Sequence, residues 1–181
     1  MFEKTDFTIT RMVLGDYENC TFVSCNFSNA DLSGITFSDC TFSSCNLSLA
    51  KLAKTSFRNA RFEDCKMLGL RFENCSEFLF SVDFKGCNLN FSTFFSRKLK
   101  KTRFLNCSLQ ETDFTEADLS GSVFNNCDLA RAAFGHTILE KVDFRSSFNY
   151  SIDPEMNRIK KAKFSFAGIT GLLNKYDIEV E

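Results

Sequence analysis

The sequence predicts an all-β solenoid: a quadrilateral β-helix of about eight 20-residue coils, with a short C-terminal helix and tail. A large apolar residue recurs at every fifth position, from Phe7 to Phe72 and again from Phe84 to Phe144. A period of five fits neither an α-helix nor a lone β-strand, so it indicates a repeat architecture. A small residue, such as Cys, Ala, Ser or Thr, stands two positions before most of the large ones. Each five-residue unit therefore forms one wall, and stacked coils bury its large and small side chains together.

Four walls rather than three make one coil. Phe and Leu alternate at the large position throughout the second run. With four walls, a 20-residue coil stacks Phe on Phe and Leu on Leu, whereas three walls would stack Phe on Leu. The cysteines agree, because Cys87, Cys107 and Cys127 are spaced by 20 residues. Neighbouring coils should then lie about 4.8 Å apart, the spacing of hydrogen-bonded strands.

The repeat spans residues 1–164 and is interrupted by a phase slip at 73–83. We expect Leu79 to occupy the missing wall, with residues 76–78 bulging outward. Exposed apolar residues beside a loop often bind partners. The alternative is that the phenylalanines of the bulge fold back and plug the core. The candidate contact loop consists of Glu77, Phe78 and Phe80.

Residues 165–181 are predicted to form a capping and dimerisation element. Apolar residues there follow helical spacing, and a strand-like tail follows at 177–180. A solenoid needs its open end capped, because exposed coil edges invite further pairing. The surplus of apolar side chains indicates that a second copy covers what remains, in a two-fold homodimer. The residues expected at this interface are Phe166, Ile169, Leu172, Leu173, Tyr176 and Ile178.

The composition indicates one domain of 181 residues without a cofactor or metal. No apolar stretch approaches membrane-spanning length and no signal-peptide pattern is present, so we expect a cytoplasmic protein without a membrane contact. Nine cysteines, an odd number, and the lack of C-x₂-C spacing argue against both a disulfide framework and zinc. We expect these cysteines to be buried reduced thiols that act as small apolar fillers.

Catalytic chemistry has little support in the sequence. His136 is the one histidine, and its position two residues after a buried phenylalanine places it on the outer surface of a coil. No nucleophile is fixed near it by spacing, and there is no glycine-rich phosphate loop. We therefore expect no catalytic residues and a protein that works through a binding surface.

Charge is arranged in bands along the chain. The net charge is −4 over residues 1–50, +7 over 51–110, −6 over 111–157 and +2 over 158–181. The acidic band supplies the candidate partner-binding residues Glu111, Asp113, Glu116, Asp118, Asp128 and Asp143. Individually such residues solvate a wall and hydrogen-bond near a corner. Collectively, rows of carboxylates on a rod of roughly duplex width could enter a cationic groove built for DNA.

A basic stretch from Arg97 to Arg103 adjoins the acidic band. We interpret it mainly as a solvated corner. Arg97 falls at a small buried position, so we expect local distortion with its side chain turned outward. Specific nucleic-acid binding is not expected, because the flanking acids would oppose it.

Several units of the chain resemble the pentapeptide-repeat family. Clear examples are CysThrPheValSer at 20–24, CysAsnPheSerAsn at 25–29, AlaAspLeuSerGly at 30–34 and CysAspLeuAlaArg at 127–131. Members of this family form a right-handed quadrilateral β-helix, so the resemblance implies the handedness. Because a fold does not determine a function, the repeat alone is a weak indicator of activity.

The tail resembles the Qnr-type branch of that family. The resemblance rests on the Ile-Asp-Pro segment at 152–154, the last coil LysLysAlaLysPheSer at 160–165 and the expected terminal helix with its short strand. In that bacterial branch, homodimers joined at their C-terminal ends mimic duplex DNA and shield DNA gyrase and topoisomerase IV from fluoroquinolones. The resemblance therefore implies a non-enzymatic, DNA-mimicking partner of a type II topoisomerase. The alternative is a structural or adaptor scaffold for another protein.

Overall fold

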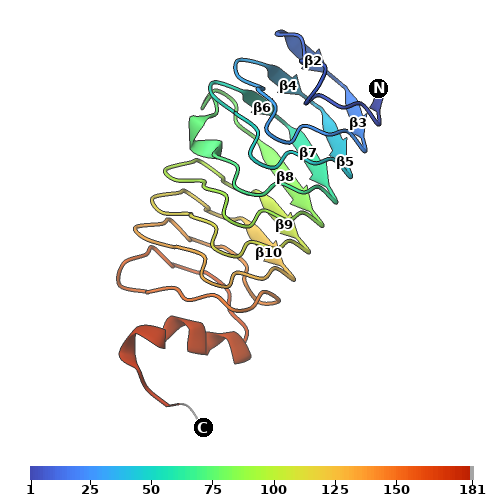
Figure 1. The fold of residues 1–181 in the computed structure, drawn as a ribbon. Helices are drawn as coiled ribbons and strands as arrows, with labels where there is room; N and C mark the ends of the chain where they lie inside the picture. The colour runs from blue at the N-terminus through green and yellow to red at the C-terminus, as the bar shows by residue number, and fades with distance from the viewer. Residues whose placement is uncertain (180–181) are drawn as a thin grey trace.

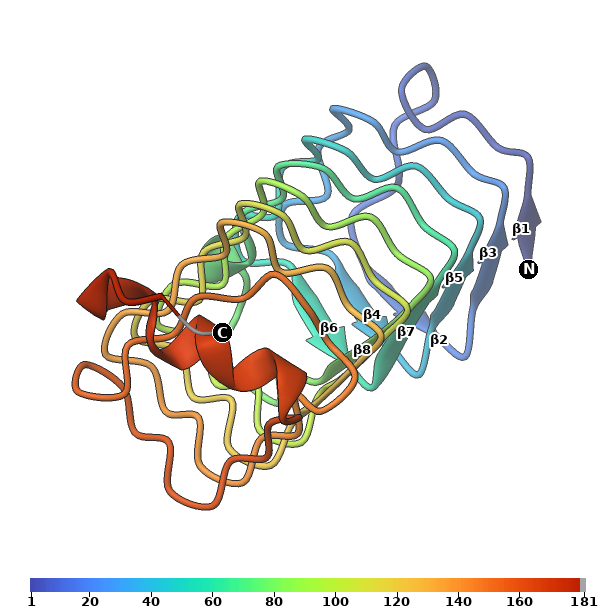
Figure 2. The same cartoon turned by 90° about the horizontal axis from the view of Figure 1, so that it is seen from below.

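Each five-residue unit forms one side of a square coil, and the coils stack into a four-sided parallel β-solenoid. The computed structural model describes residues 1–179. Figures 1 and 2 show the coils following one another along a single axis, with the helical segment at the C-terminal end. Each coil passes in turn through four walls, numbered here 1 to 4 in chain order. The predicted solenoid and its four-unit coil are confirmed.

Wall 1 is the larger sheet, in which seven strands pair in parallel in the order β1-β3-β5-β7-β8-β9-β10. Its strands are β1 (Phe2–Glu3), β3 (Thr21–Val23), β5 (Thr41–Ser43), β7 (Ala60–Glu63), β8 (Val82–Lys85), β9 (Arg103–Leu105) and β10 (Val123–Asn125). The register places Phe22 opposite Phe42, a step of 20 residues. Between β7 and β8, Phe62 pairs with Phe84, so the two extra residues of the phase slip are accommodated outside this wall.

Wall 4 begins with the smaller sheet, whose strands β2, β4 and β6 also pair in parallel. They are β2 (Asp16–Glu18), β4 (Thr36–Ser38) and β6 (Ser56–Arg58). After the bulge, wall 4 resumes as isolated bridges that join Lys98, Asp118, Ile138 and Arg158. Walls 2 and 3 are held by bridges alone, such as those through Ser108 and Asp128 on wall 2 and through Thr93 and Asp113 on wall 3.

The number of coils differs slightly from the predicted eight. The solenoid has about six turns, as marked by the seven strands of wall 1. Beyond β10 the chain continues only through isolated bridges, among them Val123 with Asp143 and Asp143 with Lys163. The last part of the repeat is therefore held by single hydrogen-bonded positions rather than by strands.

A left-handed residue turns the chain at nearly every corner. This residue lies two positions after the large apolar one, and it is usually not glycine; φ is 60° at both Lys101 and Glu116. The corner amide still pairs with the next coil, as in the bond from the Lys101 amide to the Ser120 carbonyl at 3.0 Å. Corner side chains consequently form outward-facing columns along the rod.

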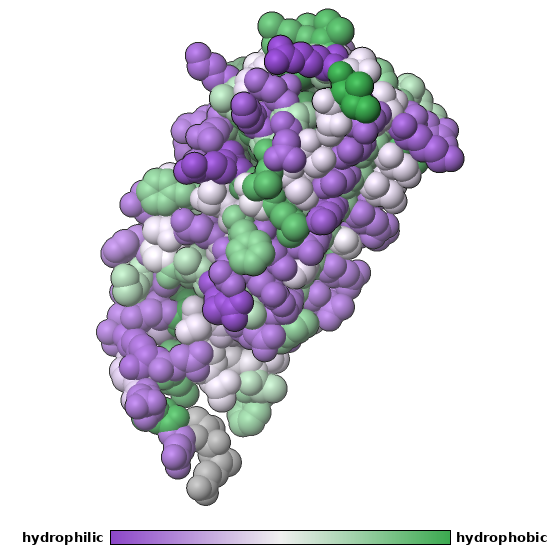
Figure 3. Space-filling view, viewed as in Figure 1, coloured by the Kyte–Doolittle hydropathy of each residue, from purple (hydrophilic) through white to green (hydrophobic). Residues whose placement is uncertain are grey.

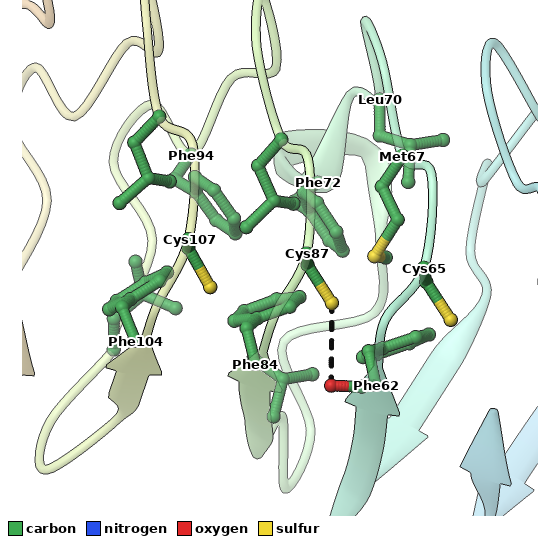
Figure 4. Close-up of a cluster of buried hydrophobic side chains, with 14 of the residues drawn as sticks. Phe62, Cys65, Met67, Leu70, Phe72, Phe84, Cys87, Phe94, Phe104 and Cys107 are labelled. Atoms are coloured by element: carbon green, nitrogen blue, oxygen red, sulfur yellow. Dashed lines mark hydrogen bonds between the residues drawn. The ribbon is translucent and has the colours of Figure 1, made fainter. Parts of the chain in front are cut away.

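The core is built from ladders of stacked rings, part of which Figure 4 shows. On wall 1 the rings of Phe62, Phe84 and Phe104 are stacked, with centroids 5.4 and 5.2 Å apart. On wall 3, Phe72 stacks on Phe94 at 4.4 Å. The two ladders meet edge to edge, since Phe84 and Phe94 lie 6.0 Å apart with ring planes at 74°. The alternation of Phe and Leu in the sequence is the consequence of this arrangement.

The cysteines are all free, and eight of the nine are buried. Figure 4 shows the thiols of Cys65, Cys87 and Cys107 in one column. Besides filling space as small apolar groups, these thiols form hydrogen bonds between coils. The Cys87 thiol, for example, donates to the Phe62 carbonyl one coil earlier at 3.4 Å. Burial raises the pKa of the Cys40 thiol to about 11, so this group stays protonated and can donate.

The C-terminal segment forms two short 3₁₀-helices rather than a helix followed by a strand. These are η2 (Ala167–Leu172) and η3 (Asn174–Tyr176). The Ile152 amide donates to the Gly171 carbonyl at 2.9 Å, which docks η2 on the last coil. Residues 177–179 form no strand, and Val180 of the expected tail lies outside the described residues. None of the helices within residues 1–179 has the length and apolar character needed to cross a bilayer.

Candidate partner-binding surfaces

The six candidate acidic residues encircle the rod. Their walls follow from the bridges, which place Asp143 on wall 1, Asp128 on wall 2, Asp113 on wall 3 and Asp118 on wall 4. Glu111 and Glu116 occupy the corners that follow walls 2 and 3. The structure therefore brings only part of the acidic band onto neighbouring surfaces.

Three of these carboxylates are paired with cations. Asp118 lies 3.2 Å from Lys100, and Asp143 lies 2.7 Å from Arg145. Glu111 forms an ion pair with Arg131 one coil later. The hydrogen bond from Arg145 holds the pKa of Asp143 below its usual range, so this carboxylate is ionised at neutral pH. The positive partners offset much of the negative field on walls 1 and 4.

The remaining three carboxylates are bound by uncharged groups. The Asp113 carboxylate accepts the Thr115 amide at 2.8 Å. Glu116 accepts the Ser96 hydroxyl at 2.8 Å. Asp128 accepts the side-chain amides of Gln110 at 2.6 Å and Asn149 at 2.9 Å. Together with the corner residue Glu111 they form what we call the acidic edge: Glu111, Asp113, Glu116 and Asp128, on walls 2 and 3.

The bulge presents two large apolar side chains to solvent. Phe78 is 66% exposed and Leu79 is 63% exposed, and Glu77 is exposed beside them. Phe80 instead packs against the core, 6.4 Å from the ring of Phe72. The prediction that Leu79 fills the missing wall is wrong: Leu79 is the turn residue with φ of 56°, which directs its side chain outward. Of the two alternatives for the phenylalanines, exposure to solvent describes Phe78 and packing into the core describes Phe80.

Arg97 is buried, which contradicts the expected outward orientation. Its side chain is 4% exposed and donates from Nη2 to the Ser76 carbonyl at 2.9 Å. The guanidinium also lies over the Phe80 ring, 4.5 Å from the centroid. The bulge provides an unpaired carbonyl and an aromatic face, so the arginine is accommodated inside rather than expelled. Arg97 thereby holds the base of the bulge against the rod.

Seven basic residues lie on wall 4 of the C-terminal half and its following corner. Besides those of the basic stretch, this wall and its following corner carry cations from the acidic and C-terminal bands. They are Lys98, Lys100, Lys101, Lys141, Arg158, Lys160 and Lys161. Sequence reasoning missed the last four, because they belong to different bands along the chain. The signal that could have found them is their spacing of 20, which places Lys141 and Lys161 at one corner.

The candidate dimer residues lie at the C-terminal end in two groups. Four are exposed: Phe166 (95%), Ile169 (47%), Tyr176 (50%) and Ile178 (55%). Leu172 and Leu173 are half-buried, and Leu172 packs against the core. A cavity of about 580 Å³ lies between η2 and wall 2 and includes Arg131, Phe148 and Tyr150 in its lining.

His136 occupies an exposed corner, as predicted. Within residues 1–179, no cluster of three or more His, Cys, Asp or Glu side chains is arranged to hold a metal ion. Figure 3 shows one face of the rod, on which hydrophilic side chains dominate and hydrophobic ones form small separate groups. The surfaces available for binding are thus the acidic edge, the bulge, wall 4 and the C-terminal end.

Comparison with known proteins gives a consistent result. A family model described as "Pentapeptide repeat region" matches residues 16–94, and one described as "Pentapeptide repeats (8 copies)" matches 87–126 and 107–145. No curated protein matches the sequence.

Two solved structures show the same fold over most of their length. A trypsin-treated variant of QnrB1, a plasmid-mediated fluoroquinolone resistance protein, aligns with a TM-score of 0.62 at 21% identity, over 99% of this chain and 97% of its own. HetL, a pentapeptide repeat protein involved in heterocyst differentiation regulation from the cyanobacterium Nostoc sp. strain PCC 7120, aligns with a TM-score of 0.56 at 14% identity. That alignment covers 91% of this chain and 88% of HetL.

Proposed function

The chain belongs to the pentapeptide-repeat family, and from this premise we propose that it is a non-enzymatic protein that binds a type II topoisomerase and protects it from quinolone-type drugs. The observation that carries the proposal is the likeness to QnrB1, which extends over 99% of the chain and so includes the C-terminal end. The rod is filled by stacked side chains, and a filled rod acts through its outer surface.

The acidic edge is the proposed contact with the enzyme. Its four carboxylates lie on two adjoining walls, and three of them have only uncharged partners. A DNA-binding groove of a topoisomerase is cationic, because it must neutralise phosphates. Carboxylates presented on a narrow rod would enter such a groove as a mimic of DNA. Asp118 and Asp143, on walls 4 and 1, belong to the outer border of this contact.

The bulge is proposed as a second contact. Phe78 and Leu79 project from wall 4, and Arg97 fixes the base of the bulge. A rigidly held aromatic side chain loses little conformational freedom on binding, so it contributes well to an interface. The bulge would then add apolar contact area that the charged walls do not supply.

We propose that two copies join at their C-terminal ends. The exposed side chains of η2 and η3, with Phe166 foremost, would bury apolar surface on pairing. A two-fold dimer would place one acidic edge on each side of the centre.

The test is DNA supercoiling by gyrase with a fluoroquinolone and increasing amounts of the purified protein. We expect the protein to restore supercoiling, and the double variant Glu111→Lys with Glu116→Lys to lose at least about tenfold in this effect. The matched control is Glu63→Lys with Glu140→Lys, which makes the same charge change on walls 1 and 4 and should retain protection. Equal loss in both variants would argue against the acidic edge, and no effect of the unmodified protein would argue against topoisomerase binding.

The second candidate function is an adaptor scaffold for another protein. The observation that favours it is the neutralisation of Asp118, Asp143 and Glu111 by cations, which leaves a smaller acidic surface than a DNA mimic would use in full. HetL, which shares the fold, is described as involved in heterocyst differentiation regulation. If gyrase is unaffected with and without drug, a partner captured through the bulge and lost in Phe78→Ser would support this function.

A further inference from the structure

Wall 4 of the C-terminal half carries an excess of basic side chains, contributed by three of its four rows. Its four rows come from successive coils, as the bridges Lys98 to Asp118, Asp118 to Ile138 and Ile138 to Arg158 establish. Each row contributes the residues before and after the buried leucine or isoleucine and the corner residue. The basic side chains of this surface, which we call the lysine wall, are Lys98, Lys100, Lys101, Lys141, Arg158, Lys160 and Lys161.

Most of this positive charge is not paired within the protein. Two acids lie on the lysine wall, and each is matched: Asp118 with Lys100 at 3.2 Å and Glu140 with Arg158 at 2.6 Å. Among the described residues, five lysines of the wall take part in no ion pair. They are Lys98, Lys101, Lys141, Lys160 and Lys161. The wall therefore has a surplus of five positive charges, although the whole chain has a net charge of −1.

The corner column gives these charges a fixed spacing. Lys101, Gly121, Lys141 and Lys161 occupy equivalent corners with φ between 59° and 71°. Their amides donate to the next coil, from Lys101 to Ser120 and from Lys141 to Lys160, each at 3.0 Å. Since hydrogen-bonded coils are about 4.8 Å apart, the column offers cations at steps of about 5 and 10 Å. Duplex DNA carries a charge about every 1.7 Å of its axis, so flexible lysines at these steps can each reach a phosphate.

We propose that the lysine wall binds the phosphate backbone of duplex DNA without sequence preference. Lysine is a point charge that suits phosphate, and it lacks the fork with which arginine reads a guanine. Among the described residues, the four rows from Lys98 to Lys161 carry no exposed aromatic ring, and the exposed ring of Phe78 lies on the bulge, one coil before them. A single ring at one end of the rows is no continuous platform for stacking successive unpaired bases.

The same surface fits other partners less well. Protein interfaces are poor in lysine at their centre and rely on aromatic or arginine anchors, and Ile138 is the one large apolar residue at an outward position here. Membrane surfaces bind basic segments that also insert apolar side chains; on this wall the exposed ones, Phe78 and Leu79, are confined to the bulge and are not interleaved with the lysines. A polyanion that is bound by charge alone matches what the wall presents.

This inference does not depend on the proposed topoisomerase contact. The acidic edge lies on walls 2 and 3 and the lysine wall lies on wall 4, so the two contacts use different residues and adjoin only near Asp118. One molecule could hold DNA with one side while an enzyme occupies another.

The experiment measures binding of a labelled duplex of mixed sequence by fluorescence anisotropy, at low salt and across a salt titration. The test variant is Lys101→Glu with Lys141→Glu and Lys161→Glu. Glutamate is tolerated at such corners, because Glu111 and Glu116 occupy them with φ of 54° and 60°. The control is Lys51→Glu with Lys54→Glu and Lys66→Glu, which makes the same charge change on walls 2 and 3, also at exposed lysines.

We expect the test variant to lose affinity by about tenfold or more at low salt. The slope of log affinity against log salt should fall by roughly 2 to 3, since three phosphate contacts are removed. The control should change affinity about twofold or less, and equal melting temperatures would show that both variants are folded. No binding by the unmodified protein, equal loss in both variants, or stronger binding to phosphatidylserine vesicles than to duplex would each overturn the proposal. The assay contains no enzyme, so its failure would leave the topoisomerase proposal standing.

Discussion

The small position of each unit acts as a hydrogen-bond donor as well as a spacer. At this position the hydroxyl of Thr55 donates to the Leu32 carbonyl at 2.7 Å, and that of Ser122 donates to the Leu99 carbonyl at 2.6 Å. The Cys45 thiol makes the same bond to the Phe22 carbonyl at 3.4 Å. Each acceptor is the backbone carbonyl of the large residue 23 positions earlier in the chain, one coil back and on the preceding wall. The side chain thus fastens one coil to the next at the corner, where the strand ladder is absent.

Replacing Thr55 with valine isolates this bond, because valine keeps the shape of threonine. We expect Thr55→Val to lower the free energy of unfolding by about 1 kcal/mol, since one buried hydrogen bond is lost while packing is retained. Denaturant unfolding with a fixed m-value measures the change. Thr41→Val, on the half-exposed outer side of β5, is the control and should stay within about 0.5 kcal/mol of the unmodified protein. Equal effects of the two substitutions would show that the Thr55 bond contributes little.

Elements that follow the five-residue period could be predicted from the sequence, and the bulge that interrupts the period could not. The register of Phe22 on Phe42 follows directly from the period. At the bulge there is no period. Leu79 adopts the turn conformation with φ of 56° and points outward, while Phe80 packs against the core in its place. The burial of Arg97 depends in turn on a carbonyl that only the folded bulge provides.

The C-terminal helices are held by an ion network that depends on pH. Lys175 lies 2.7 Å from Asp153 and 2.6 Å from Glu155, and Tyr176 donates to Glu155 at 2.9 Å. Hydrogen bonds from Lys175 lower the pKa of both carboxyl groups in the folded state. Their stabilisation is therefore present above the unfolded pKa values and is lost as pH falls through the folded ones, below about pH 4.

Amide hydrogen exchange of η2 and η3 tests this network. Between neutral pH and about pH 3, protection of 167–176 should fall more than protection of wall 1, after correction for the intrinsic exchange rate. Lys175→Met should give low protection at both pH values, because the partner of the two carboxylates is gone. Protection that is unchanged by acid, or by the substitution, would contradict a role for the network in docking these helices.

On the scale of the whole molecule, the neighbours of a charged side chain are set by its wall and not by its position along the chain. The bands counted in sequence combine residues that the fold separates, as with Asp118 and Asp128 on opposite walls. They also separate residues that the fold joins, as with Lys101 and Lys161 at one corner. The predicted acidic band therefore grouped acidic residues by their place in the sequence and did not show which side chains lie next to them in the fold. If the sequence is aligned in steps of 20 residues, with two extra residues at the phase slip, the residues that share a wall fall into one column.

Assembly is also a property of the whole molecule. Phe166 is 95% exposed, so Phe166→Ser with Ile169→Ser removes little from the isolated chain. We expect light scattering to give a dimer for the unmodified protein and a monomer for this double variant at the same concentration, with an unchanged far-UV spectrum. Phe91→Ser, at an exposed corner of the solenoid, is the control and should remain dimeric. A dimeric double variant would show that the C-terminal end is not the interface.

Because corners of the same conformation recur every five residues, the length of the rod can change only in fixed steps. Adding or removing one whole coil would change the separation between the bulge and the C-terminal end by about 4.8 Å and leave every side chain on its own wall. Adding five residues would instead rotate everything beyond that point by a quarter-turn and bring Phe over Leu in the core. Reach and facing direction are thus set by two separate kinds of insertion, so this architecture can adjust the distance between its contact points without redesigning any of them.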